Sequence, residues 1–571
     1  MSEATTEPNR AMALIRRRPL AVLFLLCLVA WLPGFFTLPP LDRDESRFAQ
    51  ASKQMLESGN FIDIRFGYEP RYKKPVGIYW LQAASTAAVD AVAGVGRDRI
   101  WTYRIPSLLG ALAAVALAFW CARAFLGVEA AFLSALLLGM TLLLSAEAKI
   151  AKTDAVLLAT VIGAQAVLLR AYLARDPGRQ PLTREIALLG WAAFAVGILI
   201  KGPVIAGVCA ATIVALTVWD REWRWLGQLR PLWGLGLTLL MVVPWLVAIA
   251  LESHGAFYAQ SLGHDFAAKL AGGQETHGEP PGYYLLVTTA TFWPATLFLV
   301  PAVWAAILRR REPAMRFLIA WAGATWLLFE VVPTKLPHYV LPAYPALAMM
   351  AASFVVTPRE QGAATGRPIL PIVSSVHFLL GTALLGAGVI VLPVYYGTGT
   401  SWDLAAAAVL AAILSILAVI AMLRGSKRSA VVLASVSAVA ITAALMLDTM
   451  PRLDRIWVSP RLAAMVAVHA GRNDPPPVLA GYTEPSAKFL LGTETRLTTG
   501  YGAAEIGAAQ GGLALVEDGQ RPAFLAHLAE LEADARPIDA LSGFNYSRGR
   551  PVHITLYRLT PPHEITAPPP E

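Results

Sequence analysis

Long apolar segments recur along this chain, separated by short polar loops. Thirteen of them approach the ~20 residues that a helix needs to cross a bilayer. These segments are residues 18–36, 106–124, 127–146, 154–173, 186–200, 203–219, 231–251, 283–307, 316–333, 338–356, 369–393, 403–423 and 429–448. The pattern predicts a polytopic α-helical membrane protein with about 13 transmembrane helices.

Residues 188–219 form one apolar run that is interrupted only by Lys201-Gly202-Pro203. Proline removes a backbone donor and glycine relaxes the chain, so this triplet either kinks one helix or separates two. With two helices, and leaving aside residues 37–105, one set of loops carries 21 Lys and Arg residues and the other set carries 5. The positive-inside rule therefore favours two helices and places the N-terminus in the cytoplasm. The first run follows three arginines but lacks a small-x-small cleavage site, which predicts a retained first helix.

The same assignment of loops to the two sides of the membrane predicts the domain organisation. Residues 1–451 form the transmembrane domain, with two long periplasmic loops at residues 37–105 and 252–282. Residues 452–571 mix strand patterns with helical ones and predict a small C-terminal α/β domain on the exterior side. The strand patterns lie at residues 476–482, 512–518 and 553–559, and the helical patterns at 484–492 and 522–533.

Composition supports this interpretation. Of the 571 residues, 56% are hydrophobic and only 15% are charged, whereas soluble domains average about a quarter charged residues. The net charge of +8 comes from arginines that cluster in short loops, where they determine topology, so nucleic acid is not an expected partner. The three cysteines all fall inside apolar runs and predict no disulfide framework.

Charge gathers unusually in the first exterior loop. The stretch LDRDESRFAQASKQMLESG, residues 41–59, predicts an amphipathic helix that lies on the membrane surface and ends at Gly59. Asp42 or Asp44 would cap its N-terminus. The alternative is a carboxylate poised to take a proton from an incoming hydroxyl. Both hold if Asp42 caps the helix and Asp44 reacts.

A cationic segment follows in the same loop. Arg71, Lys73 and Lys74 lie on the side where topology disfavours positive charge, just before Pro75 and an aromatic pair, Tyr79-Trp80. Either a bound phosphate or anionic lipids of the outer leaflet would account for these cations.

Residues 43–83, RDESRFAQASKQMLESGNFIDIRFGYEPRYKKPVGIYWLQA, resemble the first periplasmic loop of bacterial aminoarabinose lipid A transferases. These belong to a wider family of polyprenyl-phosphate-sugar glycosyltransferases that includes protein O-mannosyltransferases. Three further stretches resemble family motifs in the same order, namely AKTDAVLL (151–158), LIKGPV (199–204) and KLPHYVLPAYP (335–345).

The resemblance implies a C-type (GT-C) glycosyltransferase at the outer face of a bacterial inner membrane. A sugar on undecaprenyl phosphate or a related carrier would pass, with inversion, to lipid A, a glycan or a protein. Asp44 matches the essential carboxylate of the family, as a base or as a group that orients the acceptor. Lys74 matches the residue that meets the donor phosphate, and Arg71 and Lys201 would assist it. Positions that would contact substrate are Glu45, Arg47, Tyr72, Asp154, His264, Lys335 and Tyr339.

The alternatives concern a metal and the class of protein. Some relatives bind a divalent cation between a histidine, here His264, and a glutamate whose position Lys73 occupies; no metal is assigned and the cofactor stays open. Lys201 could instead snorkel to the interface. A transporter or lipid flippase would use charges such as Glu147 and Lys149, but it predicts inverted repeats that the sequence lacks. A scaffold that presents the C-terminal domain is the third possibility.

Overall fold

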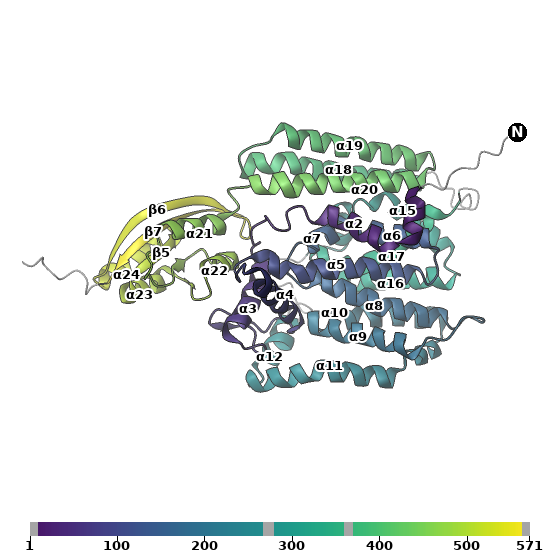
Figure 1. Cartoon of the computed structure of the whole chain (residues 1–571), viewed down its shortest axis with the longest axis horizontal. Coiled ribbons are helices and arrows are strands. Elements are labelled where there is room, and N and C mark those ends of the chain that lie inside the picture. Colours follow the sequence, from purple (N-terminus) through teal and green to yellow (C-terminus); the bar gives the residue numbers. More distant parts are fainter. Residues whose placement is uncertain (1–9, 267–278, 359–368, 562–571) are drawn as a thin grey trace, which may run out of the picture.

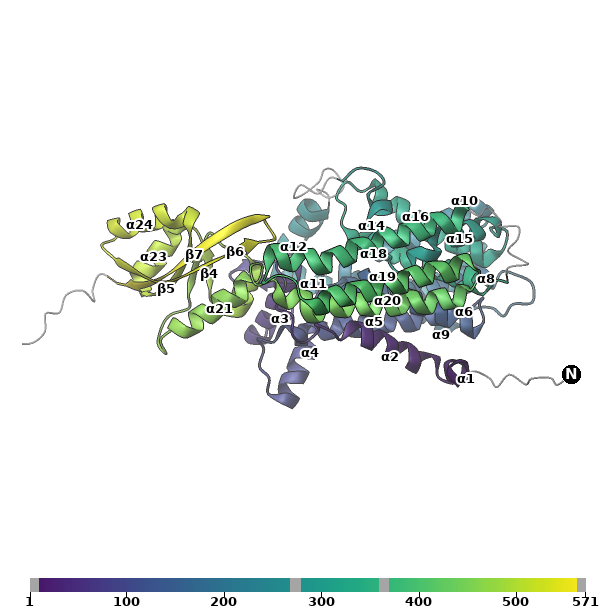
Figure 2. The ribbon, with the colours of Figure 1, turned by 90° about the horizontal axis from the view of Figure 1, so that it is seen from above.

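The computed structural model describes residues 10–266, 279–358 and 369–561. A bundle of helices makes up most of the molecule, and a smaller part with a twisted sheet is attached at one end of it (Figure 1). The turned view in Figure 2 places α1 (Arg10–Arg17) at the opposite end of the bundle from this sheet.

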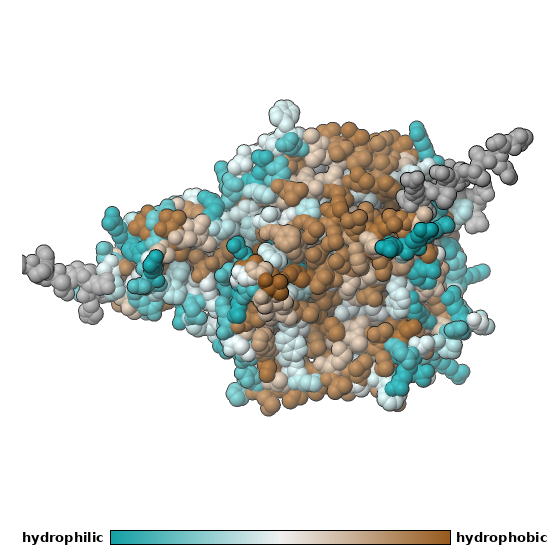
Figure 3. All heavy atoms as spheres, viewed as in Figure 1, coloured by the Kyte–Doolittle hydropathy of each residue, from teal (hydrophilic) through white to brown (hydrophobic). Residues whose placement is uncertain are grey.

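Apolar side chains surround the middle of the bundle. Figure 3 shows a broad hydrophobic band between two ends that are rich in hydrophilic residues. Apolar side chains of the bundle helices are widely exposed; Leu232, Leu240 and Leu286, for example, are 85%, 71% and 73% exposed. In water such a band would be unstable, so it marks the part of the molecule that faces lipid.

The helices of the bundle follow one another closely along the chain. They are α2 (Pro19–Trp31), α3 (Asp44–Ser58), α4 (Gly77–Ala93), α5 (Ile100–Ala122), α6 (Val128–Gly139), α7 (Leu142–Glu147), α8 (Asp154–Leu173), α9 (Arg184–Lys201), α10 (Val204–Asp220), α11 (Pro231–Glu252), α12 (Ala256–Tyr258), α14 (Tyr283–Thr291), α15 (Thr296–Leu308), α16 (Pro313–Val331), α17 (Tyr344–Val356), α18 (Ile369–Tyr396), α19 (Trp402–Leu423) and α20 (Lys427–Ala444). Tighter or wider helical turns occupy Arg224–Leu229, Ala259–Phe266, Pro337–Ala343, Leu445–Thr449 and Met450–Arg452. A short hairpin of β1 (Arg65–Phe66) and β2 (Glu69–Pro70) lies between α3 and α4.

Every predicted apolar segment falls on helix, which confirms the helical membrane fold. Among the described residues, eight helices are long and apolar enough to cross a bilayer, and α2, α6, α10 and α15 are shorter apolar helices. The figure of thirteen spans therefore stays a prediction. The predicted break at residues 201–203 is confirmed, because α9 ends at Lys201 and Gly202 takes a left-handed φ of 63°.

Helix α8 lies at the centre of the bundle. Its apolar stretch is 94% buried, and α5, α9, α10 and α16 pack around it. Helix α5 approaches it closely because Gly110 has no side chain; a Cβ atom there would meet the backbone of Val156 at 2.8 Å. Asp154 is the first residue of α8, at its outer end. The packing of α8 therefore holds this predicted site residue on a rigid element.

The C-terminal part is a sheet covered by helices on both faces. Within the described residues its strand order is β4 (Arg496–Thr498), β3 (Val478–Ala480), β5 (Gly512–Glu517), β7 (Arg550–Thr560) and β6 (Asp534–Asn545). Strand β3 runs parallel to β4 and β5, whereas β5 and β6 are antiparallel to β7. Leu513 and Leu515 pack on the side of α21 (Val458–His469), and Ala514 and Val516 pack on the side of α23 (Gly500–Gln510) and α24 (Arg521–Glu530).

The predicted α/β character of this part is confirmed. The three predicted strands correspond to β3, β5 and β7, and the two predicted helices to α22 (Pro485–Leu491) and α24. The prediction missed α21, α23, β4 and β6. Strand β6 is hard to recognise because only two of its twelve residues are buried, which leaves no alternation of apolar and polar positions.

Candidate active site

Helix α3 carries Asp44 as its first residue. Asp44 and Glu45 occupy the first turn, where the positive end of the helix dipole stabilises carboxylates. Gly59 ends the helix in the left-handed conformation, as predicted. The predicted cap by Asp42 or Asp44 is wrong: the capping position is Arg43, and in the described structure no side chain caps this end. The Asp42 carboxylate instead accepts a hydrogen bond from the Ser486 hydroxyl.

Glu45 fastens α3 to α5. Its carboxylate binds Arg104, with Nε to Oε1 at 2.8 Å and Nη2 to Oε2 at 3.0 Å, and both side chains are almost wholly buried. The backbone N–H groups of Leu41 and Ala151 donate to the same carboxylate. Arg104 also donates to three carbonyl groups, those of Phe35, Leu38 and Pro39. These partners use the acceptor positions of Glu45. The predicted contact of Glu45 with substrate is therefore replaced by a role in positioning α3.

The Asp44 side chain is exposed and lies among cations. Partial loss of water alone would raise the pKa of its carboxyl, but the charges of Lys152, Arg71 and Arg47 outweigh this and lower the pKa below its ordinary value. Asp44 is therefore a carboxylate at neutral pH, and three cations of the site act on it. Arg71 and Arg47 were predicted site residues, whereas Lys152 was not.

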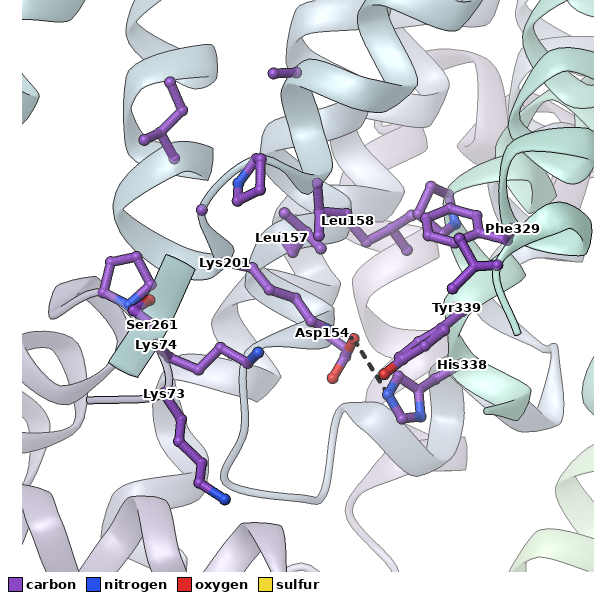
Figure 4. A pocket seen from close by; sticks show the side chains of 18 of the residues that line it. Lys73, Lys74, Asp154, Leu157, Leu158, Lys201, Ser261, Phe329, His338 and Tyr339 are labelled. Atoms are coloured by element: carbon purple, nitrogen blue, oxygen red, sulfur yellow. Dashed lines mark hydrogen bonds and ion pairs between the residues drawn. The ribbon is translucent and has the colours of Figure 1, made fainter. Parts of the chain in front are cut away.

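A cavity of about 490 Å³ opens beside this cluster at the outer ends of the helices. Lys74, Asp154, Lys201 and Tyr339, all predicted site residues, line it together with His338. Figure 4 shows Lys74 directed toward Lys201 and Asp154, whereas Lys73 points away from them. The remaining wall is largely apolar and includes Leu157, Leu158, Ile198, Val204, Leu246, Phe329 and Leu341.

The polar end of the cavity is a chain of alternating charges. Lys201 Nζ lies 2.6 Å from Asp154 Oδ1, and Lys152 Nζ lies 3.6 Å from Asp154 Oδ2. Lys152 also binds Glu147 at 2.9 Å, and His338 Nε2 lies 3.9 Å from Asp154 (Figure 4). Since the charge of Lys152 also acts on Asp44, this residue links the carboxylate of α3 to the cavity. The sequence signal for Lys152 was its place within the motif AKTDAVLL.

Two neighbouring residues of the cationic loop have different environments. Arg71 is 8% exposed, its guanidinium lies 5.2 Å from the centre of the Phe48 ring, and its Nε finds no hydrogen-bond partner among the described residues. A buried, unused donor beside Asp44 is available to a ligand. The Tyr72 hydroxyl, in contrast, donates to Asp63 at 2.8 Å, and burial together with this bond raises its pKa to about 12. We assign Tyr72 to shaping the loop.

Two predicted residues remain, Lys335 and His264. Lys335 is buried and donates to the carbonyl of Glu279 at 2.7 Å. His264 belongs to the helical turn Ala259–Phe266, and its side chain lies outside the described part of the structure, as do residues 267–278 of the second exterior loop. Over the residues that are described, no group of three or more His, Cys, Asp and Glu side chains is arranged to hold a metal ion.

Comparison with known proteins agrees with the resemblance predicted from the motifs. Residues 15–256 match the family described as dolichyl-phosphate-mannose-protein mannosyltransferase. The chain is 28% identical over 346 residues to the undecaprenyl phosphate-alpha-4-amino-4-deoxy-L-arabinose arabinosyl transferase of Pseudomonas paraeruginosa, a match that covers 58% of this chain and 59% of the relative. The enzyme of the same name from Edwardsiella ictaluri is 27% identical over 339 residues, covering 59% of this chain and 58% of the relative.

Among solved structures, the chain is similar to ArnT from Cupriavidus metallidurans. The form bound to undecaprenyl phosphate has a TM-score of 0.73 at 19% identity, with 94% of this chain and 98% of the other covered. The apo form of the same protein has a TM-score of 0.69 at 20% identity, covering 95% and 98%. The ArnT-like resemblance is thus confirmed, and the chain has the ArnT fold. Its matches span less than two thirds of the curated relatives' length.

Proposed function

We propose, from its ArnT fold and its similarity to the arabinosyl transferases, that this chain is an integral-membrane glycosyltransferase. It would move a sugar from a polyprenyl-phosphate donor to an acceptor at the outer face of the bacterial inner membrane. Aminoarabinose is the sugar of first choice, because the names of the relatives above contain this sugar on undecaprenyl phosphate. Lipid A is the acceptor of first choice because residues 43–83 resemble the first periplasmic loop of the aminoarabinose lipid A transferases. The observation that carries the proposal is the cavity in which Lys74 and Lys201 converge beside the Asp44 cluster.

The cavity suits a lipid phosphate. Lys74 and Lys201 would hold the phosphate, with Arg71 supplying a third cation from the neighbouring loop. Asp154 keeps Lys201 in place through the 2.6 Å contact. The apolar wall next to these cations would cover the first isoprene units, since burying hydrocarbon there removes it from the headgroup region.

Transfer would need little acid catalysis. The acceptor oxygen forms a bond to the anomeric carbon while the bond from that carbon to the phosphate oxygen breaks, and the electron pair leaves with the phosphate. The cations stabilise this leaving anion as its charge develops. The lowered pKa of Asp44 makes it a weak base, so it would mainly orient the acceptor, and it would take the acceptor proton late in the reaction or pass it to water.

The orientation and domain division belong to the same proposal. The N-terminus would be cytoplasmic, and the bundle of residues 1–451 would present its site on the periplasmic side. Residues 452–571 would form a periplasmic domain. The position of α1 and of the C-terminal sheet at opposite ends of the molecule supports this arrangement (Figure 2).

The test compares Asp44→Asn with Asp90→Asn in membranes supplied with polyprenyl-phosphate-linked aminoarabinose. Asp90 belongs to the same exterior loop and pairs with Arg97 at 3.9 Å, so its neutralisation controls for general effects of charge. We expect Asp44→Asn to lower transfer to lipid A by about 10²-fold or more and Asp90→Asn to keep it. Equal transfer by both variants would refute the role of Asp44. Mass spectrometry of lipid A and of surface glycans, from cells with and without the gene, identifies the acceptor.

A further inference from the structure

The C-terminal domain contacts the chain immediately before Asp44. The backbone N–H of Asp42 donates to the Tyr546 hydroxyl at 2.6 Å, and Ser486 of α22 donates to the Asp42 carboxylate. The Arg43 guanidinium donates to the carbonyl of Ser547. Tyr546 and Ser547 lie in the turn between β6 and β7, 504 positions along the chain from their partners. We call Ser486, Tyr546 and Ser547 the clamp.

The clamped backbone is strained. Arg43 has φ 64° and ψ −111°, a conformation that glycine adopts readily and that a residue with a side chain avoids. Such a conformation persists only where surrounding contacts impose it. Glu45 and Ser46 of α3 hold Leu41, on one side of the strained segment. The clamp holds Asp42 and Arg43 themselves, from the C-terminal domain.

The clamp is itself held firmly inside the C-terminal domain. Asn545, next to Tyr546, donates to the buried carboxylate of Glu484 at 2.8 Å and accepts from the backbone N–H of Arg548 at 3.1 Å. The Ser486 hydroxyl also contacts the Ser459 hydroxyl at 2.5 Å. The turn that carries Tyr546 and the helix that carries Ser486 are therefore fixed to one another before they meet Asp42.

We propose that the C-terminal domain positions the reactive carboxylate: Ser486, Tyr546 and Ser547 hold Asp42 and Arg43 in a strained conformation that keeps Asp44 beside Lys152 and Arg71. This inference rests on the proposed glycosyltransferase function and gives the C-terminal domain a part in it. The clamp residues are positioning residues, because they act on Asp44 through the backbone.

The experiment measures kcat, and KM for the polyprenyl-phosphate sugar, in Tyr546→Phe and in Tyr546→Phe/Ser486→Ala. The first variant keeps the ring and removes only the hydroxyl that accepts from Asp42. We expect kcat to fall about threefold in the single variant and about tenfold in the double variant, while the donor KM stays within twofold because Lys74 and Lys201 lie outside the clamp. Tyr501→Phe is the matched control, since this exposed tyrosine of α23 belongs to the same domain and its ring centre lies 4.2 Å from that of His527.

A rescue variant separates positioning from general damage. Arg43→Gly, added to the double variant, allows the required backbone conformation without strain, so we expect it to recover most of the lost kcat. The inference is overturned if kcat in the clamp variants equals that of Tyr501→Phe, if the donor KM rises along with the loss of kcat, or if Arg43→Gly recovers nothing. Should the double variant fail to fold, kcat and the donor KM are compared between Tyr546→Phe and Tyr546→Phe/Arg43→Gly, and the same outcomes overturn the inference. Absence of transfer by the unaltered protein would instead refute the proposed function.

Discussion

Two aspartates separated by one residue have opposite environments. Asp44 lies among cations that lower its pKa. Asp42 is largely withdrawn from water and faces the C-terminal domain; burial and then the charge of Glu484 raise its pKa to about 7, against the favourable effect of its hydrogen bonds. Asp42 thus changes charge near neutral pH, whereas Asp44 does not.

This difference predicts a pH dependence for the clamp. Tyr482, Tyr546 and Glu484 of the C-terminal domain are near Asp42, as are Arg43 and Glu45 of its own segment. Because docking raises the pKa of Asp42, the docked state binds its proton more tightly. Docking is therefore most favourable well below pH 7 and weakens as the pH rises through about 7.

We expect amide hydrogen exchange of residues 41–47, corrected for the intrinsic rate, to speed up between pH 5 and pH 8. Asp42→Asn, which stays neutral and still accepts from Ser486, should remove this dependence. If the exchange rate depends on pH equally in the unaltered protein and in Asp42→Asn, the dependence does not arise from the Asp42 carboxyl.

At the scale of elements, one buried ion pair joins α3 to α5. Arg104 in α5 and Glu45 in α3 join two helices whose contact is otherwise limited. Removing one partner of a buried pair leaves an uncompensated charge, which typically costs about 3–5 kcal/mol. We expect Arg104→Leu to lower the free energy of unfolding by about this amount.

The loss is measured by unfolding the detergent-solubilised protein with heat or denaturant. Arg123→Leu serves as the control, since Arg123 lies at the opposite end of α5, is exposed, and donates to the nearby carbonyl of Leu126 at 2.8 Å. The double variant Glu45→Gln/Arg104→Met removes both charges and should recover most of the stability. A stable Arg104→Leu protein would show that the pair is not needed to anchor α3.

Local signals predicted much of this region and missed its long-range contacts. Gly59 marked the end of α3, and the Lys201-Gly202-Pro203 triplet marked a helix break, because both effects arise within a few residues. Lys74, Lys201 and Asp154 were predicted to share one site, and they line the same cavity. That prediction came from the resemblance to family motifs and not from the local chemistry of the residues. The sequence could not indicate that Glu45 pairs with Arg104, 59 positions away, or that Asp42 meets Ser486, 444 positions away. Such partners depend on the packing of the whole fold.

At the scale of the whole molecule, the site, the clamp and the C-terminal sheet share one end of the bundle (Figure 1). Arg175 and Arg316, at the far ends of α8 and α16 from that site, share the carboxylate of Asp220. This arrangement is the one that the distribution of arginines predicted for a protein with a cytoplasmic N-terminus.

Labelling with a membrane-impermeant maleimide checks the orientation. Cys27, Cys121 and Cys209 are all buried, so background labelling should be low. We expect Tyr501→Cys, in the C-terminal domain, to react in spheroplasts, and Arg310→Cys, between α15 and α16, to react only after lysis. The reverse pattern would place the site on the cytoplasmic side and overturn the proposed topology.

The clamp has a consequence for the order of events during synthesis. Asp42 and Tyr546 are 504 residues apart, and ribosomes add about 5–20 residues per second, so about 25 to 100 s pass between them. The segment that carries Asp44 emerges early but meets its last structural partners only when the final strands have been made. A nascent or truncated chain would then hold its donor lipid but react slowly, and full activity would begin only in a finished protein.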